Sequence, residues 1–157
     1  MNKTRLFLCT ALAFSLIIFT NVIAQDIDVN MDAEVLVTLS GTVQQYPGFG
    51  KFSVGDAGGT VSTDGIGSGT VVPMAGSDFR DLIIFANGTA NTAFMLNIPA
   101  ATLINQNSAE MTTDAVDVSD TLDGSGVLAI NSVLVLNVGT NQDSGLYNGT
   151  VIASLHY

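Results

Sequence analysis

The sequence is poor in the residues that usually carry chemistry. Its 157 residues include one cysteine, one histidine and no tryptophan. His156 falls on the polar face of an expected strand, so we predict no Ser-His-Asp or Cys-His catalytic set. Fourteen acids would allow two-carboxylate chemistry, but they are spread through turns and no tryptophan offers a sugar platform. The sequence therefore predicts a protein that is not an enzyme and that uses no cofactor.

Basic residues are also scarce. Four lysines and arginines stand against fourteen acids, for a formal charge of −10. Nucleic-acid binding needs a basic patch, so this balance argues against nucleic acid as a partner. It also argues against binding to anionic lipid surfaces, and it favours solubility outside the cell.

The first 24 residues have the three parts of a secretory signal. Lys3 and Arg5 precede an apolar run over residues 6–20, which is too short for a membrane span, and cleavage is expected before Gln25. The expected mature chain, residues 25–157, keeps two basic residues against fourteen acids, a formal charge of −12. It loses Cys9, so we expect no disulfide in it. We also expect no membrane span in it. Its length suits a single domain.

The rest of the chain contains short segments in which apolar and polar residues alternate, separated by frequent turn residues. Turn signals recur every eight to twelve residues, which is typical of antiparallel sandwiches and barrels. Clear turns are expected at Asp56–Gly59, Asp64-Gly65, Asn87-Gly88, Asp123–Gly126 and Asn141–Gly145. Asn131 is expected to mark a bulge or a break. The strands expected between the turns are 27–39, 50–54, 59–63, 69–74, 81–86, 92–98, 115–118, 126–130, 132–138 and 146–157.

The two terminal strands are the most unusual. Over residues 27–39 every odd position is apolar, and most even positions up to 34 are acidic or amide. Thirteen alternating residues exceed the usual strand length of about five or six, so residues 25–40 are expected to form a long strand whose first half can project as a donor arm. The side chains expected to insert into a partner are Ile27, Val29, Met31, Ala33 and Val35.

The last twelve residues alternate in the same way. A sheet that ends on an apolar strand leaves an edge that either an earlier strand or another chain must cover. The face expected to accept a partner strand consists of Tyr147, Gly149, Val151, Ala153, Leu155 and Tyr157. Such a donor and acceptor on one chain would join copies head to tail into a filament.

Several segments resemble a bacterial secreted family, the domain-of-unknown-function 4402 family. They are Gly48–Phe52, Gly58–Ser62, Asp64-Gly65, residues 91–99, the turn at residues 122–126 and the closing segment Gly145–Val151. This family in turn resembles the pilin subunits of archaic chaperone–usher and spore-coat-U type. The resemblance implies an all-β, antiparallel, immunoglobulin-like (pilin-like) β-sandwich that lacks its last strand.

The resemblance also implies partners and a location. A periplasmic chaperone would lend a strand first, and the N-terminal segment of the next subunit would replace it at an outer-membrane usher. The chain is then a secreted subunit of a bacterial surface fibre, exported through the periplasm. The final aromatic, Tyr157, matches the pilin pattern, although many pilins carry it one position earlier.

Two alternatives remain open on the sequence. The N-terminal strand could fold back on its own sheet, which would make the chain a self-complete binding module or adhesin that acts as a monomer. The carboxylates at Asp114, Asp117, Asp120 and Asp123 could bind calcium weakly, although a solvated acidic loop is the simpler interpretation. The opening Asp26-x-Asp28-x-Asn30 lacks the glycine and glutamate of an EF-hand.

Overall fold

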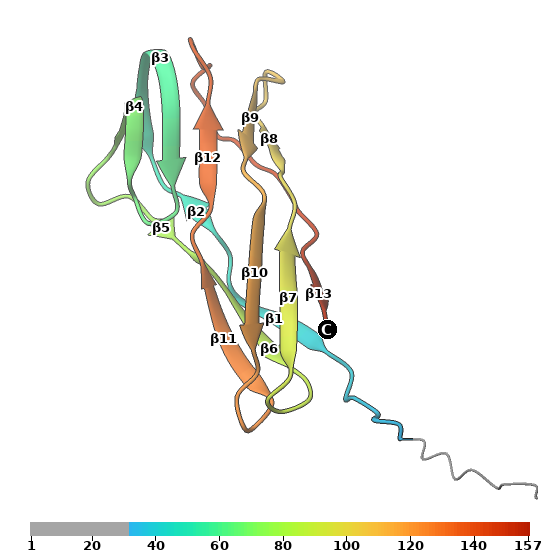
Figure 1. Cartoon of the computed structure of the whole chain (residues 1–157). Coiled ribbons are helices and arrows are strands. Elements are labelled where there is room, and N and C mark those ends of the chain that lie inside the picture. The colour runs from blue at the N-terminus through green and yellow to red at the C-terminus, as the bar shows by residue number, and fades with distance from the viewer. Residues whose placement is uncertain (1–31) are drawn as a thin grey trace, which may run out of the picture. The chain divides into compact units, whose positions relative to one another are not determined.

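The computed structural model describes residues 32–157, of which Val35–Tyr157 form one compact unit. The expected signal segment 1–24, the start at Gln25 and the expected donor residues Ile27, Val29 and Met31 lie outside the described residues. The described part contains strands and no helix (Figure 1), and thus no helix long and apolar enough to cross a membrane. Its strands are β1 (Ser40–Gln45), β2 (Gly48–Phe49), β3 (Phe52–Ser62), β4 (Gly67–Pro73), β5 (Phe79–Arg80), β6 (Leu82–Asn87), β7 (Ala93–Ile98), β8 (Thr102–Ile104), β9 (Glu110–Thr113), β10 (Val116–Thr121), β11 (Val127–Ser132), β12 (Val135–Val138) and β13 (Ser154–His156).

All the strand pairs within residues 32–157 are antiparallel, and they form four sheets. Two three-stranded sheets have the orders β1-β6-β11 and β10-β7-β13. A five-stranded sheet has the order β4-β3-β12-β9-β8, and β2 pairs with β5. Strand β12 follows β11 after a two-residue break but belongs to a different sheet, so the chain changes layers there. The expected all-β fold with antiparallel pairing is therefore confirmed.

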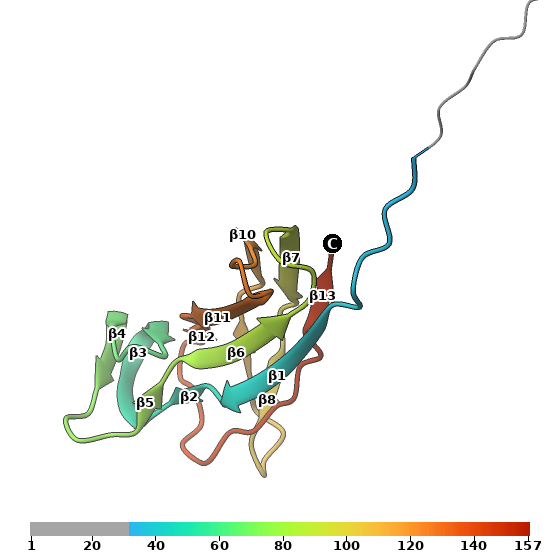
Figure 2. The same ribbon diagram turned by 90° about the horizontal axis from the view of Figure 1, so that it is seen from below.

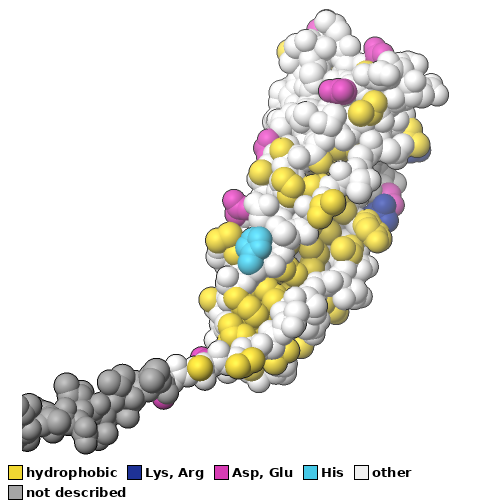
Figure 3. All heavy atoms as spheres, turned by 90° about the vertical axis from the view of Figure 1, so that its right-hand side faces the viewer, with side chains coloured by type: hydrophobic (Ala, Val, Ile, Leu, Met, Phe, Trp, Pro, Cys, Tyr) yellow, Lys and Arg dark blue, Asp and Glu magenta, His cyan; other side chains and the backbone are white. Residues whose placement is uncertain are grey.

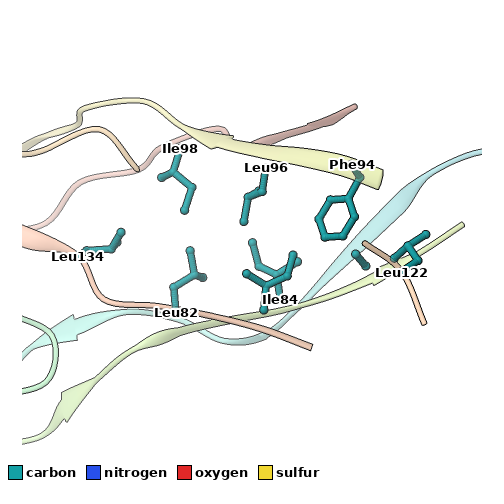
Figure 4. Packing of buried hydrophobic residues seen from close by; sticks show 9 residues of the cluster. Leu82, Ile84, Phe94, Leu96, Ile98, Leu122 and Leu134 are labelled. Carbon is teal, nitrogen blue, oxygen red and sulfur yellow. The ribbon is translucent and has the colours of Figure 1, made fainter. Parts of the chain in front are cut away.

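The larger core lies between the two three-stranded sheets. Leu96 and Ile98 on β7 face Leu82 and Ile84 on β6 (Figure 4), and each is at most 6% exposed. The period-two alternation of β6 and β7 produces this arrangement, because every second side chain turns inward. This sandwich-like packing puts β1 and β13 on the same side of the core (Figure 2).

A second core is formed by side chains of the five-stranded sheet, on β3, β4, β9 and β12. It contains Val61, Val71, Met111, Leu136 and Val138, all at most 5% exposed. Residues 56–59, expected to form a turn, instead lie within β3, where the pairing with β4 shifts between Val54 and Gly59. Gly58 has a φ of 68° with the Val138 and Gly139 carbonyls close by, so glycine permits a bulge here and the chain does not reverse. The true reversal is the next one, at Asp64-Gly65.

The long terminal strands are the main correction. Residues 32–39 belong to no strand, and pairing begins only at Ser40. Of residues 146–157 only Ser154–His156 form a strand, with an isolated bridge between Asn148 and Ile104. Alternation predicts which side chains share a face, but a strand also needs a neighbour to bond to. In the described residues these segments lack a neighbour along most of their length.

Some other boundaries also differ from those expected. The break expected at Asn131 falls after Ser132, at Val133 and Leu134, where the chain passes from one sheet to the next. The short strands β8 and β9 were not predicted, because Ala101–Thr113 contains few apolar residues in alternation. The tight turn at Asp123–Gly126 is confirmed, since Asp123 accepts hydrogen bonds from the amides of Ser125 and Val127.

Candidate functional site: an open groove beside β1

Two strand edges face each other without pairing. Within residues 32–157, strand β1 bonds only to β6, and β13 bonds only to β7. Residues 149–153, which lead into β13, belong to no strand. Leu155 lies over Gly41, and Tyr157 reaches Val37, so β1 and the C-terminal segment run in opposite directions along the seam. Each edge therefore has backbone groups free to bond to an inserted strand.

A groove of about 590 Å³ lies along this seam. One wall is β1 with the residues on either side of it, from Leu39 to Pro47, and the other is the segment from Gly149 to Leu155. Its floor consists of core side chains: Leu82, Ile84, Leu96, Ile98 and Leu134. None of the described residues that line it is charged. Figure 3 shows a stripe of hydrophobic side chains along the face of the molecule that carries the C-terminal segment.

The groove is a gap in the packing of the core. Protein interiors have few voids larger than a water molecule, and the core side chains on the floor of this groove are each 1–6% exposed. Apolar side chains bordering such a gap lack contacts on one side. A strand with apolar side chains at alternate positions would supply those contacts.

Tyr157 closes one end of the groove. Its hydroxyl donates a hydrogen bond to the Val37 carbonyl (2.6 Å) and accepts one from the Thr89 amide (2.7 Å). The Val37 amide also donates to the Thr89 hydroxyl (2.6 Å). A Cβ at residue 88 would collide with the Tyr157 hydroxyl, so Gly88 leaves the room this contact needs. Val37, which lies shortly before β1, is therefore held at this end of the groove, the Tyr157 end.

The opposite end widens into a second cavity of about 980 Å³. It lies between Gly48–Val54 on one side and Gln142–Val151 on the other, and it shares Gly149, Thr150 and Val151 with the first groove. Lys51, Arg80, Asp78 and Asp143 line it. This end is therefore charged, whereas the groove beside β1 is apolar.

A network centred on Tyr147 holds the wall of this wider end. The Tyr147 hydroxyl accepts hydrogen bonds from Asn105 Nδ2 (3.2 Å) and Gln142 Nε2 (2.8 Å) and donates to the Asp143 carbonyl (2.7 Å). Asn105 is only 5% exposed, and its Oδ1 also accepts the amides of Asn107 and Ala109. The polar side chains around Tyr147 thus fix the segment 142–148 without any strand.

The expected acceptor residues divide into two groups. Gly149, Val151, Ala153 and Leu155 line the groove beside β1, and Val151 and Leu155 are partly buried against the core. Tyr147 lines the wider end and packs on the second core, and Tyr157 closes the opposite end. The residues of the opposite wall, Leu39, Gly41 and Val43, were not predicted. The apolar alternation continues from 35 to 43, but the expected N-terminal strand ended at Leu39 and no strand was expected over 41–43.

Only Ala33 and Val35 of the expected donor residues lie in the described part of the chain. Both are exposed and belong to no strand, with Val35 93% exposed. An apolar side chain left this open to water gains no burial energy within the described unit.

The acidic stretch is not a shared site. Asp114 accepts a hydrogen bond from Asn137 Nδ2 (2.7 Å), and Asp117 accepts one from Asn97 Nδ2 (2.5 Å). Asp123 bonds within its own turn, where hydrogen bonds from Ser125 and the Val127 amide lower its pKa. Within residues 32–157 no group of three or more histidine, cysteine or acidic side chains is arranged to hold a metal ion. His156 is exposed on β13, as expected.

Comparison with known proteins adds no relative. No family model matches the chain, and no curated protein or solved structure matches it.

Proposed function

We propose that this protein is a structural subunit of an extracellular fibre, and that residues 27–35 of one copy insert as a strand into the groove of the next. The single observation that carries the proposal is the apolar groove between the unpaired edges of β1 and β13. An inserted strand would bond to free backbone groups at both edges, while alternate side chains fill the gap in the core.

The length and pattern of the donor segment suit the groove. Residues 27–35 are nine residues long and apolar at five alternate positions. A strand of that length spans about 30 Å. The β1 wall from Leu39 to Pro47 is also nine residues long. A strand of residues 27–35 would therefore run the length of this wall.

The linking residues favour insertion into another copy. For the segment to reach its own groove, the chain must reverse between residues 35 and 39. Those residues are Val-Leu-Val-Thr-Leu, with no glycine, asparagine, aspartate or proline for a tight turn. Both backbone groups of Val37 are also held, by Thr89 and Tyr157. A hairpin here would require β-branched residues in positive φ and the loss of these bonds.

The direction of insertion determines the assembly. The donor segment leaves its own domain at the Tyr157 end. If it enters the neighbour at the wide end of the groove, where Lys51 lies (the Lys51 end), it runs antiparallel to β13. The neighbour's own segment is then free to reach a further copy. This contact never closes, so it builds a filament. Insertion from the Tyr157 end would instead let two copies exchange segments in a closed dimer.

The finer features of the fold and the partners belong to the same proposal. A strand added between β1 and β13 would complete an immunoglobulin-like sandwich of the pilin kind. Until a neighbour arrives, a periplasmic chaperone would cover the groove, and an outer-membrane usher would support the exchange. The account places the protein on the bacterial surface, and it gives the chain no catalytic step.

A pair of single substitutions in the expected mature chain tests the proposal. Val29→Asp places a carboxylate on the face that enters the groove, where burial without a partner costs several kcal/mol. Asn30→Asp adds the same charge to the opposite face and is the matched control. Light scattering and size-exclusion chromatography should detect fibres for the wild type and for Asn30→Asp, and monomers for Val29→Asp, with unchanged far-UV circular dichroism. Unfolding of the monomer by Val29→Asp would show that the segment pairs within its own chain, as in a monomeric binding module.

A further inference from the structure

The two basic residues of the expected mature chain are both at one place. Among residues 25–157 the only lysine and arginine are Lys51 and Arg80, and both line the wide end of the groove. Fourteen acids are spread over the same residues. Two copies with a formal charge of −12 each repel one another, so a local pair of cations that can bind carboxylates would speed their association.

Strand pairing positions Arg80, and Lys51 lies two residues after the end of β2. Arg80 on β5 lies opposite Gly48 on β2, and its guanidinium lies over the place where a side chain at residue 48 would begin. Its Nε is 3.2 Å from Asp78 Oδ2, and the side chain is 47% exposed. A guanidinium has five N–H donors, so this contact leaves several for another carboxylate. Lys51 is exposed and forms no ion pair within residues 32–157.

The donor segment carries the complementary charge. Its odd residues are apolar, and its even residues include Asp28, Asp32 and Glu34. Successive side chains of a strand point to opposite faces, so an inserted strand that buries its apolar side chains turns these carboxylates outward, toward the rim of the groove. With insertion from the Lys51 end, Asp32 and Glu34 come last along the strand and lie nearest to that end.

We propose that Lys51 and Arg80 bind the Asp32 and Glu34 carboxylates of a second copy of this chain, and so select the donor segment and guide it to the groove. This inference rests on the proposed strand insertion. Asp78 and Asp143 line the same end. The two positive and two negative charges there balance, whereas the rest of the protein is acidic. The contacts are exposed, and they act chiefly on the rate of association and on its dependence on salt.

Charge exchange between the two sides tests the inference in the mature protein. The double variants K51E/R80E and D32K/E34K each bring like charges together. We expect each alone to assemble about tenfold more slowly than wild type at low ionic strength. A mixture of the two, in which each groove meets a segment of opposite charge, should assemble at nearly the wild-type rate. The differences should shrink near 1 M salt, where the screening length is about 3 Å.

The mixture also shows that both variants are folded, since only folded proteins can restore assembly. Wild-type rates for K51E/R80E alone at low salt would overturn the inference while leaving strand insertion intact. Slow assembly that the mixture fails to restore would overturn it too. Failure of the wild type itself to assemble would refute the proposed function, and with it this inference.

Discussion

Removal of a single hydroxyl from each of the three tyrosines tests how the wall of the groove is held. The Tyr147 hydroxyl makes three hydrogen bonds, and the Tyr157 hydroxyl makes two. Tyr46 is 73% exposed, and no described residue bonds to its hydroxyl. Substitution by phenylalanine removes the same hydroxyl oxygen at all three positions and hardly changes the side-chain volume. Only the environment of the lost hydroxyl differs.

The environments set the expected order of cost. Tyr147→Phe leaves Asn105 Nδ2 without this partner in a residue that is only 5% exposed. A buried polar group left without a partner costs about 1–3 kcal/mol. At Tyr157, which is 44% exposed, water can replace the lost partner, so the expected cost is about 0.5–1.5 kcal/mol. Tyr46→Phe should change the free energy of unfolding by less than about 0.5 kcal/mol.

Urea unfolding of the mature chain, followed by far-UV circular dichroism, measures these differences. We expect the midpoint to fall most for Tyr147→Phe, less for Tyr157→Phe and hardly at all for Tyr46→Phe, with the slope unchanged. If Tyr147→Phe were as neutral as Tyr46→Phe, the network would not hold segment 142–148, and the account of the wide end of the groove would be wrong.

Three further predictions concern the body of the domain. Gly69→Ala should destabilise by more than about 1 kcal/mol, because φ is 64° and a carbonyl oxygen lies 2.6 Å from the added carbon. Gly124→Ala, which meets nothing within 4 Å, is its control in thermal melts. Thr63→Val should cost about 1–3 kcal/mol in urea unfolding, since the buried hydroxyl bonds to Asp81 (2.6 Å). The pKa of Asp123 is lowered in the fold, so its contribution is full above the ordinary value of 3.8 and is lost as pH falls through the lower folded value. Asp123→Asn should therefore flatten the fall in melting temperature below about pH 4, and an equally steep fall would contradict this.

Alternation in the sequence was enough to predict β6 and β7. Strands β6 and β7 bond on both sides and bury every second residue, and both were expected within one residue of their observed bounds. Gly58 and Gly59 were misread as a turn because a bulge and a turn use the same residues. Only the register of β3 against β4 distinguishes them, and that register depends on residues distant in the sequence.

The sequence predicted only one of the two walls of the candidate site. The apolar face of the last twelve residues predicted one wall of the groove, and Val151 and Leu155 do turn toward the core. The other wall was missed because one long strand was expected over 27–39, whereas pairing begins only at Ser40. Lys51 and Arg80 are 29 positions apart, and the pairing of β2 with β5 brings Arg80 next to the residues that precede Lys51.

Disulfide trapping tests the central claim, strand insertion between copies, most directly. The expected mature chain has no cysteine, so a pair introduced by substitution has no native competitor. Met31 is the middle of the five apolar donor positions, and Ala153 is the middle of the odd positions from 149 to 157. If residues 27–35 fill the groove from end to end, these two positions meet whichever way the strand runs.

The double variant Met31→Cys/Ala153→Cys, oxidised during assembly, should form a ladder of covalent oligomers on non-reducing gels. Met31→Cys/Ala129→Cys is the control, because Ala129 is exposed on β11, a strand that does not line the groove. The account predicts a ladder for the first pair and none for the second. A monomer with an internal disulfide in the first pair, or no disulfide at all, would contradict it.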